Sequence, residues 1–151
     1  MNTKTEHIQL EMESHSNLKL RYGLAALRIS IGIVFIWFGA LKFFPTLSPA
    51  ETLATSTISI LTFGLIPAKV SILLLALGEC AIGLALLIGA YMKVTLILLL
   101  LHMFCTISPM FFFPEMIFTN IPFGLTLVGQ YIVKNIIIIS GGGVLIAAVS
   151  E

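Results

Sequence analysis

An acid and an imidazole inside long apolar segments have the clearest chemical potential in this sequence. Glu79 lies in "LLLALGECAIGLALLIG" and His102 lies in "TLILLLLHMFCTI". A carboxyl or an imidazole is costly to bury unless it finds a hydrogen-bond partner. If the two side chains meet, they form a pair that can hold and transfer a proton. Both are therefore candidate catalytic residues.

The positions of Glu79 and His102 predict that they do meet. A short turn near Tyr91–Lys93 joins the two apolar segments. Counting outward from that turn in both directions puts both residues near mid-membrane, at nearly the same depth on adjacent helices. The functional interpretation is a proton-handling or ligand-binding pair. The alternative is a polar clasp that only holds the helices together, worth about 1 kcal/mol.

Basic residues and glycines share one stripe of the first apolar segment. Their spacings alternate between four and three, which keeps them on one helical face. Glycines let a second helix approach closely, and a charge facing lipid at mid-depth costs about 3 kcal/mol, so we expect this stripe to face protein. Snorkelling of each cation to the nearer interface is the alternative. The stripe consists of Arg28, Gly32, Phe35, Gly39 and Lys42.

A cationic site is predicted at the outer mouth of the protein. Lys134 begins the last apolar segment, at the level at which Lys42 ends the first, and Lys69 is near. Two ammonium groups at one level suit an anion or an oxygen-rich ring. The alternative is that these lysines meet lipid phosphate. The candidate ligand-binding residues are Arg28, Trp37, Lys42, Gln130, Lys134 and Asn135.

The remaining reactive side chains give no metal or redox motif. Cys80 and Cys105 lie within apolar segments and lack C-x-x-C or metal-ligand spacing. We interpret both as buried thiols that act as small hydrophobic residues. No haem, flavin or iron–sulfur signature is evident, and no basic patch suggests nucleic-acid binding.

The amino-acid composition indicates whether these residues are surrounded by water or by a lipid bilayer. Of 151 residues, 58 % are hydrophobic and 10 % are charged, whereas a soluble domain carries about 25 % charged residues. The chain is thus predicted to be an all-α integral membrane protein with four transmembrane helices, since a span takes about 20 residues. After a polar cytoplasmic tail, residues 1–22, the membrane domain covers 23–150. The expected spans are 23–44, 68–90, 92–113 and 132–150.

Loops and charges predict the topology. Basic residues gather before the first span and in the turn at Lys93, so the positive-inside rule places both termini in the cytoplasm. "SPAETLATSTISILTFGLIP" predicts a short interfacial helix after the first span, with Ser48 and Glu51 forming a capping box. "FFFPEMIFTNIPFGLTLVGQY" is too apolar for a loop in water. We expect both long loops to form a lid over the outer end of the bundle.

The sequence resembles a known family of membrane proteins. "LRISIGIVFIWFGALKFFP", "GECAIGLALLIG" and "GQYIVKNIIII" are similar to the DoxX-like family of small bacterial inner-membrane proteins, and to related proteins linked to reactive-chlorine resistance. The resemblance covers about residues 23–150. It implies a four-helix bundle in the bacterial plasma membrane and a link to respiratory quinones, sulfur-compound oxidation or stress defence. It supplies no catalytic residues.

Three functional hypotheses follow from these observations. In the first, the bundle is a quinone-linked redox or stress-defence component, with Glu79 and His102 as a proton relay and the lysines stabilising an anionic head group. Its partners would be the lipid bilayer, a bound quinone or small anionic ligand, and other membrane or redox subunits. The second is a small-solute transporter that uses the same buried charges. The third is a non-catalytic membrane subunit whose polar residues only clasp helices.

Overall fold

Four long helices dominate the computed structural model, which describes residues 3–44, 47–48 and 51–150. Within these residues, four helical stretches are long and apolar enough to cross a membrane. They lie in α1 (Thr3–Leu41), α3 (Ala68–Ile88), α4 (Met92–Ile107) continued by α5 (Pro109–Phe112), and α7 (Leu127–Ser150). The spans themselves are Asn17–Leu41, Ala68–Ile88, Met92–Phe112 and Leu127–Val149.

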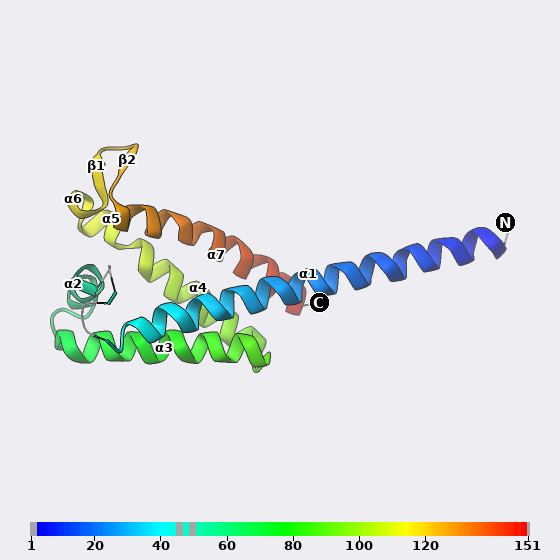
Figure 1. The fold of residues 1–151 in the computed structure, drawn as a ribbon, viewed down its shortest axis with the longest axis horizontal. Coiled ribbons are helices and arrows are strands. Elements are labelled where there is room, and N and C mark those ends of the chain that lie inside the picture. The colour runs from blue at the N-terminus through cyan, green and yellow to red at the C-terminus, as the bar shows by residue number, and fades with distance from the viewer. Residues whose placement is uncertain (1–2, 45–46, 49–50, 151) are drawn as a thin grey trace.

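The long helices pack as two pairs, α1 along α3 and α4 along α7. Figure 1 shows that the described ends of the chain lie towards the same side of the bundle as the α3–α4 turn, which we call the turn end. The pairs spread apart toward the opposite side, the loop end, where α2 and the connection between α5 and α7 lie (Figure 1).

The glycine stripe of α1 allows close contact with α3. A Cβ atom added to Gly83 would lie 2.8 Å from the carbonyl oxygen of Gly32, and one added to Gly39 would lie 3.0 Å from Cβ of Glu79. Neither position has room for a larger side chain. The prediction that this stripe faces protein is confirmed, and the contact sets the position of Glu79 relative to α1.

Apolar side chains from all four long helices fill the bundle from the turn end to the level of His102. Leu86, Leu96 and Leu99 are fully buried there. Gly89 has φ 80° and Tyr91 φ 45°, so the chain reverses sharply between α3 and α4. The buried cluster comprises Ile31, Phe35, Ile82, Leu86, Leu96, Leu99, Met103 and Leu145.

Shorter elements close much of the loop end. The helix expected after the first span exists as α2 (Glu51–Leu61), although Pro49 and Ala50 of its start lie outside the described residues. Ile117 is fully buried in a second apolar cluster with Leu53 of α2 and Ile132 of α7. Both long connections thus pack together. The remaining elements are α6 (Pro114–Ile117), β1 (Phe118–Asn120) and β2 (Gly124–Leu125).

Three features differ from the sequence prediction. The expected all-α membrane bundle is confirmed, but β1 and β2 add a small antiparallel hairpin to its second long connection. α1 extends back to Thr3 without a break, so the segment expected to be a polar tail is helical throughout its described part. α7 begins at Leu127, about a turn earlier than the expected start, because Thr126 Oγ1 accepts a hydrogen bond from the Gly129 amide (3.1 Å) and caps the helix.

Candidate functional site

Three ionisable side chains meet near the middle of the α3 and α4 spans, just beyond the last residue of α1. Lys42 directly follows α1, and its Nζ donates to Glu79 Oε2 of α3 at 2.5 Å. His102 Nε2 of α4 lies 3.1 Å from the other carboxylate oxygen, Oε1. When the carboxylate is ionised, the imidazole N–H is the donor. We call Lys42, Glu79 and His102 the triad.

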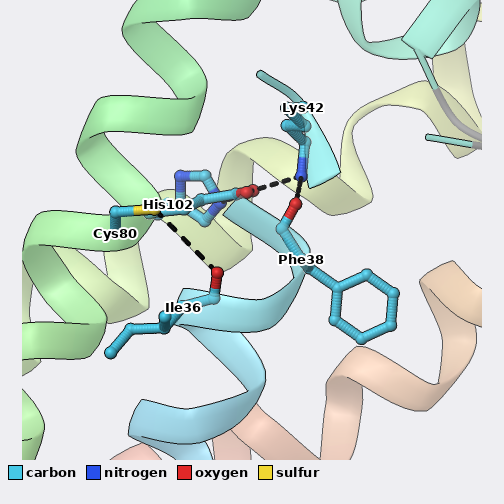
Figure 2. Close-up of polar contacts among 6 residues, drawn as sticks. Ile36, Phe38, Lys42, Cys80 and His102 are labelled. Carbon is cyan, nitrogen blue, oxygen red and sulfur yellow. Dashed lines mark hydrogen bonds and ion pairs between the residues drawn. The ribbon is translucent and has the colours of Figure 1, made fainter. Parts of the chain in front are cut away.

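Each member of the triad is positioned by a contact with α1. Glu79 faces α1 because Gly39 leaves room for it. Lys42 Nζ also donates to the carbonyl oxygen of Phe38 at 3.3 Å, which turns the ammonium back along its own helix (Figure 2). The ring of His102 meets that of Phe35 edge to face, with centroids 5.6 Å apart. These contacts fix the geometry without help from a ligand.

The triad is shielded from water but not sealed. The exposed fractions of the side chains are 10 % for Lys42 and Glu79 and 14 % for His102. A buried carboxylate needs an opposite charge and further hydrogen bonds to offset its desolvation. Lys42 supplies the charge, and both carboxylate oxygens have a partner. The expected hydrogen bond between Glu79 and His102 is confirmed, whereas the pairing of Lys42 with Glu79 was not expected.

The triad forms one part of the wall of a cavity of about 630 Å³. Most of the wall is apolar, and it includes side chains from α1, α2, α3, α4, α5 and α7. Besides the triad, the side chains with polar or sulfur atoms that line it are Ser48, Thr57, Met103, Cys105, Thr106, Tyr131, Lys134 and Asn135. A volume of this size accommodates a small organic ligand.

The cavity brings together some of the candidate ligand-binding residues and leaves others apart. Lys134 and Asn135 line it together with Lys42. Trp37 is 67 % exposed and Gln130 is also exposed, and neither lines it. Arg28 lies instead at the turn end, where its guanidinium packs against Gly89 and the α3 carboxyl end attracts a cation.

Lys134 differs from Lys42 in its partners. Its Nζ lies 5.7 Å from the centroid of the Tyr131 ring, and no carboxylate pairs with it among the described residues. The wall of the cavity therefore contains two ammonium groups. The charge of Lys42 is neutralised by Glu79, whereas that of Lys134 has no carboxylate partner among the described residues. Lys69 is exposed and does not line the cavity.

The cysteines have different environments. Cys80 is half-buried, with Sγ 3.9 Å from the carbonyl oxygen of Ile36 (Figure 2). Cys105 is exposed and lines the cavity, so its interpretation as a buried thiol is wrong. Cys105 lies at the edge of the His102 face, and the splaying of the helices leaves that edge unpacked. No group of three His, Cys, Asp or Glu side chains suited to a metal occurs among the described residues.

Comparison with known proteins identifies one family. A family model described as DoxX matches residues 23–119, which run from the first span to the β1 strand. The match includes all three members of the triad but ends before Lys134 and Asn135. No curated protein and no solved structure gives a significant match.

Proposed function

The chain belongs to the DoxX family, and from this premise we propose that it is a quinone-linked redox component whose cavity binds the quinone. The observation that carries the proposal is the position of the triad in the wall of a largely apolar cavity. A quinone has the same division, with a polar ring and an apolar tail. The ring would lie against Lys42 and His102, and the tail against the apolar wall.

The chemistry of the triad suits the proton side of quinone reduction. Carbonyl oxygens of a quinone accept hydrogen bonds, and Lys42 and His102 both carry donors. When such an oxygen gains electrons it becomes negative, and a nearby cation stabilises it. His102 and Glu79 can pass a proton between them over 3.1 Å. The electrons would come from a partner redox subunit, since the chain carries no redox motif of its own.

Measurement of retained quinone tests this proposal. The full chain is purified in mild detergent from membranes that contain quinones, extracted with organic solvent, and the quinone per protein is quantified. We expect stoichiometric quinone in the wild type and about tenfold less in Glu79→Gln, because Lys42 loses its charged partner. Glu115→Gln is the matched control, since Glu115 is exposed and lies outside the cavity. Absence of quinone from the wild type, or equal retention by both variants, refutes the proposal.

One observation favours a second function, transport of a small anion. Lys134 adds a positive charge to the cavity that no described carboxylate balances. A small anion would supply the missing negative charge. Counterflow of a labelled anion in liposomes distinguishes the two functions, because a quinone-binding component shows none.

A further inference from the structure

The seam between α1 and α7 is closed at the turn end. A Cβ atom added to Gly141 of α7 would lie 3.2 Å from the terminal methyl groups of both Ile31 and Leu27 of α1. Gly141 and Ile31 are both buried. The two helices therefore touch directly at this level.

The same seam is open from one helical turn nearer the loop end onward. Val34 and Phe38 of α1 line the cavity, as do Tyr131 and Ile138 of α7. The exposed fractions are 38 % for Val34 and 44 % for Phe38 and Tyr131. In Figure 2 the ring of Phe38 points away from Lys42 and His102. These side chains line the cavity and are also exposed on the outer surface of the bundle.

Lining the cavity does not by itself cause such exposure. Phe35 is 3 % exposed, and Met103 and Leu53 are each 4 % exposed, although all three also line the cavity. High exposure therefore marks an edge where the cavity reaches the surface of the bundle. Val34, Phe38 and Tyr131 place such an edge between α1 and α7.

The position of this edge along the transmembrane helices determines whether lipid or water lies outside it. Val34 and Phe38 belong to the span Asn17–Leu41, and Tyr131 and Ile138 belong to the span Leu127–Val149. The medium around these spans is lipid. A ligand that passes through the seam therefore comes from the bilayer, and an apolar tail can stay in the seam.

We propose that the ligand enters the cavity sideways from the bilayer, between Val34 and Phe38 of α1 and Tyr131 and Ile138 of α7. The ligand class is an amphiphile with an oxygen-rich head, which reaches the triad, and an apolar tail, which remains in the seam. The inference rests on the proposed function, because both concern the same cavity. It adds the route and the requirement for a tail.

A second edge of the cavity gives the natural comparison. Leu61, at the end of α2, lines the cavity and is 43 % exposed. It lies outside the four spans. A ligand that entered there would arrive from the loop end rather than from the hydrocarbon. Obstruction of each edge in turn therefore distinguishes the two routes.

The test compares two probes with one ring, dimethoxy-methyl-benzoquinone without a tail and the same ring with a decyl tail. The association rate and the affinity of each probe for the full chain in nanodiscs are measured for the wild type, Val34→Trp, Leu61→Trp and Ile33→Trp. Ile33 is the matched control, because it neighbours Val34, is 52 % exposed and does not line the cavity. We expect Val34→Trp to bind the tailed probe about tenfold more weakly, with a change of less than about threefold for the tail-less one. Ile33→Trp and Leu61→Trp should resemble the wild type.

The other outcomes refute the inference in distinguishable ways. If Val34→Trp binds the tailed probe as the wild type does, or Leu61→Trp alone loses it, the lateral route is wrong while quinone binding stands. If Val34→Trp and Ile33→Trp lose both probes equally, the effect is on folding, and Ile138→Trp must then give the selective loss for the route to hold. If the wild type binds neither probe, the proposed function fails and the inference fails with it.

Discussion

Lys42, Glu79 and His102 show how an ionised group is kept inside a membrane helix bundle. The carboxylate receives one charged donor and one imidazole donor, at 2.5 and 3.1 Å. Such an arrangement is stabilising only while it is complete, because loss of one partner leaves an uncompensated charge. The triad is therefore sensitive to single substitutions and tolerant of paired ones.

Lys42→Met should lower the free energy of unfolding by about 3 kcal/mol, because Glu79 then keeps only His102 as a partner. The double variant Lys42→Met/Glu79→Gln should recover most of this loss, since it leaves no unpaired charge. Reversible unfolding in mixed micelles measures both values. A double variant that loses the sum of the two single losses would contradict the pairing of Lys42 with Glu79.

All three members of the triad were candidate site residues in the sequence, but only the contact between Glu79 and His102 could be predicted. Glu79 and His102 lie at equal distances from a short turn, and helical rise then sets their depth. Lys42 ends its span, and that position alone suggests the mouth of the cavity. Its pairing depends on a long side chain that folds back, as the bond to the carbonyl oxygen of Phe38 shows. The available signal was Gly39, whose lack of a side chain brings Glu79 against α1.

At the scale of elements, the pairing of α1 with α3 is governed by small residues rather than by apolar area. Lipid tails are as apolar as leucine, so helices in a membrane associate through close packing. Gly32 and Gly83 provide that close packing. Because Glu79 is carried by the same face of α3, this contact also positions the triad.

Gly83→Ala should destabilise the protein by about 1–3 kcal/mol, because the added methyl group would lie 2.8 Å from Gly32 and Ile36 atoms. Gly78→Ala is the control on the same helix, where no heavy atom lies within 4 Å of the new carbon. Its effect should stay within about 0.5 kcal/mol. Equal losses in the two variants would contradict the packing argument, because helix propensity alone favours alanine at both positions.

The long helices could be predicted from hydropathy, but their ends could not. A span must be apolar throughout, so its existence appears in composition. The start of α7 depends instead on one hydroxyl, because Thr126 caps the helix. The hairpin of β1 and β2 depends on a few backbone contacts, which leave no periodic pattern in so short a segment. Local hydrogen bonds therefore determine the start of α7 and the β1–β2 hairpin, which hydropathy does not predict.

At the scale of the whole molecule, an even number of spans puts the two ends of the chain on one side. The described ends of α1 and α7 do lie towards the turn end (Figure 1). The basic residues before the first span and at Lys93 belong to that end as well. From the positive-inside rule we expect this end to face the cytoplasm.

Epitope tags fused to the two ends should be digested together by a protease added to inside-out vesicles and protected together in right-side-out vesicles. The shared behaviour follows from the even number of spans, and its direction follows from the basic residues. Protection assayed by immunoblotting measures both. Tags on opposite sides would contradict four spans, whereas both tags digested only in right-side-out vesicles would contradict the orientation alone.

Trp37 is the single tryptophan of the chain, and its indole faces outward from α1. It lies little more than one helical turn from Lys42. The tryptophan fluorescence of the wild-type protein therefore reports on the outward-facing surface of α1, at nearly the level of the triad. Quenching by lipids that carry nitroxides at graded positions along their chains converts that signal into the vertical coordinate of the charged cluster in the bilayer.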